Sequence, residues 1–308
     1  MPPVPAVISV LLCLCCCGCA KPTLAADSAA RVAASCHLSA TATAYNDIRL
    51  DEDNRPPGRK AELSPQVLNK IRALGAQGLR TSDAPDPYPG ECNDLFGKVF
   101  RLAVSRGVYL YSAEVSPISA IKLLFLILYD PATGALTKDP PKIDVKSTQM
   151  FGWKDPLLEK PLISFADLLQ NHRRQIVVEE RVHNGTMYNG VVYNYFDVGP
   201  DLSLTRVLAL EKRVLTIGAQ EGLIVRTLER SGPNQLRLKS YMTPEGKLRK
   251  RQELGYVILE TAGPGSPFHV KQRHPKSKDV DSILVTYSGA NEQGSDDAFL
   301  RDGYTFHY

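Results

Sequence analysis

Residues 121–130 read IKLLFLILYD, and this stretch decides the fold of the chain. It carries one charge before its final Asp130, at Lys122, and is otherwise apolar. Such a composition is typical of a strand that is buried on both faces. We therefore expect residues 121–129 to form the central strand of a β-rich body.

Similar short runs, rich in branched and aromatic residues, continue from Gly107 to the C-terminus. Gly, Pro, Asn and Asp separate them, and these residues favour turns. The strand candidates are GVYLYSAEV, IKLLFLILYD, QIVVEERV, GVVYNYFDV, GLIVRTLER, QLRLKSY, GYVILE, SILVTYS and GYTFHY. Their number and spacing predict an antiparallel sandwich, barrel or propeller-like domain over residues 107–308.

The clearest helix is SPQVLNKIRALGAQG, at residues 64–78. Ser64 suits the N-cap, Pro65 suits the first helical position, and apolar residues follow at helical spacing. Two glycines are expected to end the helix, Gly75 and Gly78.

A second helix, from Asp94 toward Ser105, is less clear, because residues 99–104 fit a strand equally well. Residues 61–106 are thus expected to form a helical region. The predicted fold class is mainly β with a small helical N-terminal region, that is, α+β.

The chain has 308 residues, of which 43% are hydrophobic and 23% charged. This composition allows one or two domains with a full core and argues against intrinsic disorder. The formal charge of +4 is too small, over this length, to make nucleic acid the expected partner.

The N-terminus begins with an apolar stretch at residues 4–17, without a charge before Lys21. Its length suits a signal peptide and falls short of the roughly 20 residues that a membrane-spanning helix needs. LLCLCCCGCAKP at residues 11–22 holds five of the seven cysteines of the chain. Their spacing does not suit a tetrahedral zinc site.

The segment Cys16-Cys17-Gly18-Cys19 resembles the lipobox of bacterial lipoproteins, with Gly18 as the small residue before the lipidated cysteine. The resemblance implies a signal peptide over residues 1–18, palmitate and other acyl groups on Cys19, and a tether over residues 19–60. It also implies a cell-envelope location, at the outer membrane and facing the periplasm. Ordinary cleavage, which gives a secreted soluble protein, and a retained membrane anchor are the alternatives.

Two cysteines remain, Cys36 and Cys92. In a protein outside the cytoplasm they are the only plausible disulfide pair, and the alternative is two buried free thiols. No Cys-His motif accompanies either residue, so neither is expected to be catalytic.

SFADLLQNHRRQIVVEE, at residues 164–180, resembles a degenerate FG-GAP or VCBS-type repeat. Its matching positions are Phe165, Asp167 and Asn171, with a strand over residues 176–178. An acid and both glycines of the motif are replaced, by Leu169, Gln170 and His172. Because calcium needs the missing oxygen ligands, we expect no metal here.

No enzyme motif emerges. The Ser-x-x-Lys match at residues 119–122 opens an apolar strand instead of a helix. None of the six histidines has a metal-binding spacing, and Glu179 and Glu180 point to opposite faces of a strand. We expect neither catalytic residues nor a cofactor, and the alternative is an envelope hydrolase whose site is assembled from distant loops.

Two regions are candidates for binding. Tyrosines in GVVYNYF and just before it offer apolar area with a polar tip, although core packing also explains them; the candidates are Tyr188, Tyr193 and Tyr195. Residues 226–251 hold eight Lys or Arg and two acids. This segment suits an anionic surface, with a soluble charged hairpin as the alternative, and its densest part is Arg249, Lys250 and Arg251.

The sequence therefore predicts an exported, lipid-anchored envelope protein that acts as a non-catalytic binding or structural module. Its expected contacts are the bacterial membrane, through the lipid, and an envelope protein, a glycan or a membrane surface. Nucleic acid is not expected as a partner.

Overall fold

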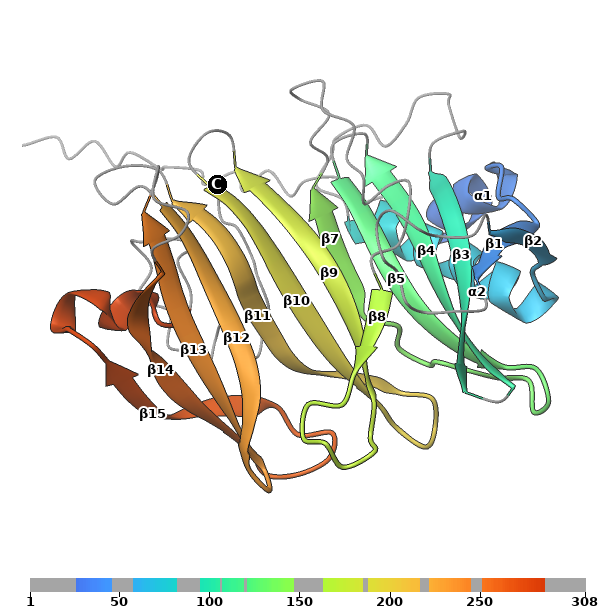
Figure 1. Ribbon diagram of the computed structural model, residues 1–308. Helices are drawn as coiled ribbons and strands as arrows, with labels where there is room; N and C mark the ends of the chain where they lie inside the picture. Colours follow the sequence, from blue (N-terminus) through green and yellow to red (C-terminus); the bar gives the residue numbers. More distant parts are fainter. Residues whose placement is uncertain are drawn as a thin grey trace, which may run out of the picture.

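A computed structural model describes residues 26–45, 58–81, 95–105, 107–118, 121–146, 163–184, 188–216, 222–244 and 251–285. Within these ranges the chain forms two β-sheets, two α-helices and a 3-10 helix near residue 280 (Figure 1). The architecture is mainly β and sandwich-like, with a small helical part at the N-terminal end. The predicted fold class is confirmed.

The first sheet has seven strands, in the order β2-β1-β3-β4-β5-β6, and β7 also pairs with β5. Strands β1 and β3 are parallel, whereas the other neighbours are antiparallel. The strands are β1 (Thr41–Tyr45), β2 (Arg59–Glu62), β3 (Phe96–Ser105), β4 (Val108–Ile118), β5 (Ile121–Asp130), β6 (Ala135–Leu136) and β7 (Lys142–Lys146).

Strand β5 is buried on both faces, as its composition predicts, but it is not central in the sheet, because only β6 and β7 lie beyond it. It pairs with β4 on one side and with β6 and β7 on the other. Phe125 and Ile127 belong to a core beneath the helices, whereas Leu126 and Leu128 belong to a second core on the other face of the sheet. Burial on both faces explains why the strand lacks the alternation of polar and apolar residues.

Helices α1 (Ala26–Ser35) and α2 (Pro65–Thr81) cover one face of the first sheet (Figure 1). The N–H of Val67 donates to Oγ of Ser64 at 3.3 Å, which confirms the predicted N-cap. Arg72 of α2 donates to the carbonyl of Ala34 at 2.8 Å and so satisfies the C-terminal end of α1. The sequence predicts no helix at α1, whose buried positions are held by two small residues, Ala29 and Ala33.

The prediction that Gly75 and Gly78 end the helix is wrong, because α2 continues to Thr81. A Cβ on Gly75 would lie 2.6 Å from the ring of Phe96, and one on Gly78 would lie 3.4 Å from Pro117. Gly75 therefore allows the helix to approach the sheet closely, whereas a side chain at Gly78 would make only an ordinary van der Waals contact.

The predicted helix from Asp94 toward Ser105 is also wrong, and the strand alternative is correct. Strand β3 pairs with β1 and β4. Val99 faces the core beneath the helices and Leu102 faces the opposite core, as alternation along a strand requires.

The second sheet is an eight-stranded antiparallel meander in which every strand pairs with its neighbours in the chain. Its strands are β8 (Ile163–Ala166), β9 (Gln175–Asn184), β10 (Tyr188–Val198), β11 (Leu204–Thr216), β12 (Gly222–Gly232), β13 (Gln235–Pro244), β14 (Gln252–Thr261) and β15 (Phe268–Pro275). The 3-10 helix η4 (Lys278–Ile283) follows β15.

The two sheets pack against each other through a shared apolar core. The first sheet contributes residues such as Leu102 and Leu126, and the second contributes residues such as Ile176 and Phe196. Oγ of the buried Thr137 donates to the carbonyl of Leu202 at 2.9 Å, which adds a polar link between the sheets. Strands before and after residues 147–162, which lie outside the described ranges, thus share one core.

Replacing Phe196 with alanine tests this shared core. Phe196 is 1% exposed, and we expect Phe196→Ala to lower the free energy of unfolding by about 3–5 kcal/mol. Thr205→Ala, at an exposed position of β11, should change it by less than about 0.5 kcal/mol. Urea denaturation measures both; equal midpoints would show that Phe196 does not support the packing.

Candidate functional site

Four predicted site residues lie outside the described part of the chain: Cys19, Cys92, Arg249 and Lys250. Cys36 is buried and disulfide-bonded. Its pairing with Cys92 stays a prediction, because Cys92 lies outside the described residues. Arg251 is exposed directly before β14.

The predicted tyrosines are on β10, which Tyr188 begins. The rings of Tyr193 and Tyr195 stack with centroids 6.5 Å apart. Tyr195 is 4% exposed, and burial, together with Tyr193, raises the pKa of its hydroxyl above the usual value. The Tyr193 hydroxyl donates to Glu179 Oε2 at 3.1 Å. Core packing accounts for Tyr195, and Tyr193 lies half-buried at the margin of that core.

The second sheet has two contrasting faces. Its apolar face carries one continuous core that includes Leu210, Leu238 and Val257. The opposite face is apolar on β9 and β10, where Ile176 and Phe196 contact the first sheet. On β12 to β15 that same face is polar and reaches solvent.

A row of cations and aromatic rings crosses this solvent-facing part. In the strand register, Lys239 of β13 lies opposite Tyr256 of β14, which lies opposite His274 of β15. The rings of Tyr256 and His274 stack with centroids 4.4 Å apart. The guanidinium of Arg237 lies 5.2 Å from the centre of the Tyr256 ring, within cation–π range. We call Arg237, Lys239, Tyr256 and His274 the cation–aromatic row.

Acidic residues partly balance the row. Glu229 Oε1 lies 2.9 Å from Nζ of Lys239 and 3.3 Å from Nη1 of Arg237. The hydrogen bond from Lys239 lowers the pKa of Glu229, and the same bond raises the pKa of Lys239. The glutamate stays ionised, so two cations share one anion at this end of the row.

The basic segment at residues 226–251 does not form one surface. Arg226 is 0% exposed on the apolar face, whereas Arg237 and Lys239 lie on the opposite face. Alternation along the strands causes this division. No sequence signal marks Arg226 as buried, because its partner Glu211 comes from another strand, at an Nη1 to Oε1 distance of 2.9 Å.

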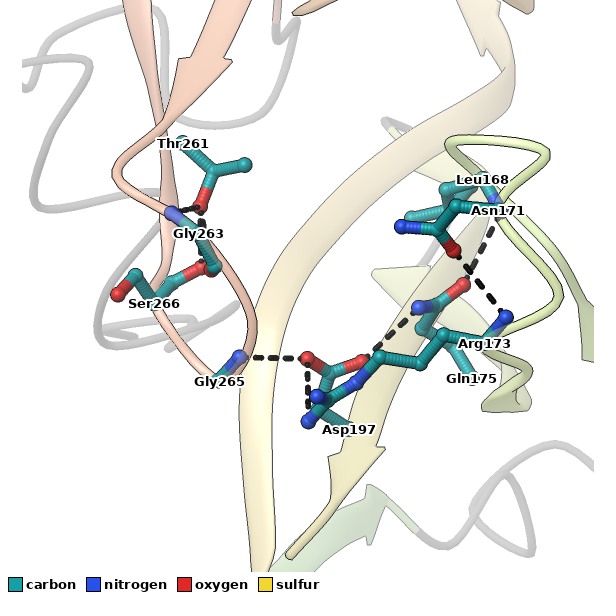
Figure 2. A network of polar contacts seen from close by, with 9 residues as sticks. All are labelled: Leu168, Asn171, Arg173, Gln175, Asp197, Thr261, Gly263, Gly265 and Ser266. Atoms are coloured by element: carbon teal, nitrogen blue, oxygen red, sulfur yellow. Dashed lines mark hydrogen bonds and ion pairs between the residues drawn. The ribbon is translucent and has the colours of Figure 1, made fainter. Parts of the chain in front are cut away.

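Distant segments converge on Asp197, at the end of β10 (Figure 2). Its carboxylate accepts from Nε2 of Gln175 at 2.9 Å and from the N–H of Gly265 at 2.7 Å. Nη2 of Arg173 lies 3.3 Å from Oδ2. Gly265 belongs to the β14–β15 connection, so this loop reaches across the sheet to the end of β10.

This convergence is the kind of assembly that a hydrolase built from distant loops would require. The contacts of Asp197, however, are an amide, a main-chain N–H and a guanidinium. These groups hold a carboxylate in place and supply no nucleophile. The network therefore fastens the sheet.

The loop between β8 and β9 contains the residues that resemble the FG-GAP or VCBS-type motif. Asp167 accepts from the N–H groups of Asn171 at 3.0 Å and His172 at 2.8 Å. Gln170 and His172, at the two glycine positions of the motif, have φ values of 50° and 66°. The carboxylate of Asp167 thus stabilises a left-handed loop through main-chain groups.

No protein-family model, curated protein or solved structure matches this chain. Among the described residues, no group of three or more His, Cys, Asp or Glu side chains is arranged to hold a metal ion. None of the helices within the described ranges is long and apolar enough to cross a membrane. The function must therefore be argued from the surfaces themselves.

Replacing Asp197 with alanine tests the fastening network. Asp197→Ala leaves the buried amide of Gln175 and the partly buried N–H of Gly265 without their acceptor, and we expect a loss of about 2–3 kcal/mol in the free energy of unfolding. Amide exchange at residues 263–266 should also become faster. Asp139→Ala, at an exposed aspartate, is the matched control. Unchanged exchange at Gly265 would contradict this role.

Proposed function

We propose that the chain is an exported envelope protein, anchored by lipid on Cys19, that acts by binding and not by catalysis. The lipobox-like leader supports the lipid anchor and the location at the outer membrane. The disulfide at Cys36 supports a compartment outside the cytoplasm, since disulfides persist in oxidising surroundings.

The cation–aromatic row is the observation that carries the binding role. It places a guanidinium, an ammonium and two stacked rings on one solvent-facing part of a sheet. A rigid sheet holds these groups in fixed positions, so binding a partner costs little side-chain entropy. Arginine and aromatic rings contribute strongly at interfaces, and the cations favour a partner that carries anionic groups.

An acidic patch of an envelope protein, an anionic glycan and an anionic membrane surface all meet this description. Each would lie within reach of a protein that is tethered to the membrane by its N-terminus. We propose that one of them contacts the row.

The intact mass of the protein, measured from a membrane fraction, tests whether the chain is anchored in the cell envelope. We expect a mature species that begins at Cys19 and carries added acyl mass, because the lipobox directs cleavage before the lipidated cysteine. Cys19→Ser should abolish both the added mass and the membrane association. Cleavage near Ala26 without lipid would contradict the anchor.

Co-sedimentation with isolated envelope fragments tests the row. The full chain carries Cys19→Ser in this experiment, so that the lipid does not dominate the binding. We expect Arg237→Ala combined with Lys239→Ala to raise the apparent dissociation constant at least about tenfold, which corresponds to a combined loss of about 1.4 kcal/mol in binding free energy. Lys98→Ala combined with Lys142→Ala removes the same charge from exposed positions of the first sheet and should change little. Equal binding by both pairs would exclude the row as the contact surface.

A further inference from the structure

The largest fully buried side chain in the described part of the protein is that of Arg226, on the apolar face of the second sheet. Its Nη1 donates to Oε1 and to the main-chain oxygen of Glu211, both at 2.9 Å. The register shifts by one residue of β11 between the pairs Val191–Arg213 and Val192–Glu211, next to Glu211. The charge of Arg226 is thus balanced within the sheet.

The other donors of Arg226 hold the last part of the described chain. Residues 278–285, which we call the strap, consist of η4 and the two residues after it. Nε of Arg226 donates to the oxygen of Leu284 at 3.1 Å, and Nη2 donates to that of Ile283 at 2.6 Å. Oγ of Ser240 also donates to the oxygen of Leu284, at 2.6 Å.

Apolar contacts complete the attachment. Leu284 and Val285 are buried in the core of the apolar face, and Val280 and Ile283 pack against it. The strap is therefore a cover for a face that would otherwise expose a large apolar area.

The strap is weak by itself. Its 3-10 hydrogen bonds are long, at 3.4 Å from Val280 to Ser277 and 3.3 Å from Leu284 to Asp281. Ser277, at the N-cap, makes no side-chain capping bond. No strand pairing includes the strap, so its position depends on the apolar face, on Arg226 and Ser240, and on Arg273 of β15. Nη1 of Arg273 donates to the main-chain oxygen of Asp281 at 2.7 Å and lies 3.4 Å from its Oδ1.

The chemistry of this attachment is unusual for a cover that serves stability alone. A buried ion pair is often no more stabilising than well-packed apolar residues of similar volume. Arg226 instead gives the strap a specific polar attachment, through hydrogen bonds to two main-chain oxygens. Such an attachment can be replaced by any group that offers oxygens in the same geometry.

We propose that the strap covers a binding site for a fatty acid, which displaces it. Removal of the strap leaves Nε and Nη2 of Arg226 and the hydroxyl of Ser240 in need of acceptors. Nε and Nη2 lie on one edge of the guanidinium, and a carboxylate binds such an edge with two parallel hydrogen bonds. The linear acyl chain takes the place of the strap's apolar side chains.

Half-buried side chains around the core extend the apolar surface that such a chain would contact. They include Tyr193, Leu228, Met242 and Val270. This site lies on the opposite side of the sheet from the cation–aromatic row, so it is independent of the proposed envelope contact.

The first test uses the full chain with Cys19→Ser, oleate as the probe and oleyl alcohol as its uncharged counterpart. Oleate should bind saturably and at least tenfold more tightly than the alcohol, as measured by calorimetry. Hydrogen exchange at residues 278–285 should become at least tenfold faster when oleate is bound. Absence of saturable binding, or binding that leaves exchange in the strap unchanged, would overturn the proposal.

The second test removes the polar attachment. Arg226→Met combined with Glu211→Met deletes both buried charges, so neither is left without its partner. We expect exchange of the strap to rise at least tenfold without ligand, and the preference for oleate over oleyl alcohol to disappear. Arg230→Met, at an exposed position of the same strand, should change neither property.

A retained preference for oleate in the folded double variant would also overturn the proposal. If that variant does not fold, hydrogen exchange in the Cys19→Ser chain tests the proposal by itself. The proposal requires the strap to open at a lower free energy than the strands beneath it. Exchange of the strap only through global unfolding would exclude displacement.

Discussion

The second sheet has more apolar area than its partner sheet covers, and this constraint shapes the rest of the molecule. Its eight strands form one meander, but the first sheet contacts them mainly near β8 to β11. Side chains alternate between the two faces, so every strand places some residues on each face, and those residues must suit what lies against them. On the opposite face, the strands that the first sheet does not cover carry polar residues that contact solvent. On the apolar face, the strap covers part of the apolar surface.

The distribution of basic residues follows from the same constraint. On the opposite face, Arg237 and Lys239 remain hydrated and share Glu229. On the apolar face, Glu211 and main-chain oxygens surround the guanidinium of Arg226 and offset the cost of burying its charge. One basic segment thus contains residues with two unrelated roles, and its net charge does not measure the charge of any single surface.

Local pattern was enough to predict part of this structure. The run at residues 121–129 identified a strand that is buried on both faces, because such burial leaves a continuous apolar signature. Ser64 identified the start of α2, since capping is a local interaction. The role of Gly75 could not be predicted, because it depends on Phe96, a residue that approaches only in the folded chain. For the same reason the sequence indicated basic residues but not which of them would be buried.

Two buried charged residues, Asp197 and Arg226, each bind main-chain groups of a segment that comes late in the chain. Asp197 accepts from the main-chain N–H of Gly265, and Arg226 donates to main-chain oxygens of Ile283 and Leu284. Each charge thus fixes a segment that comes late in the chain against strands that come earlier. Since both late segments flank β15, which carries His274, the docking of these segments also orders the edge of the cation–aromatic row. The two faces of the sheet are therefore chemically separate but share the strands that hold them in position.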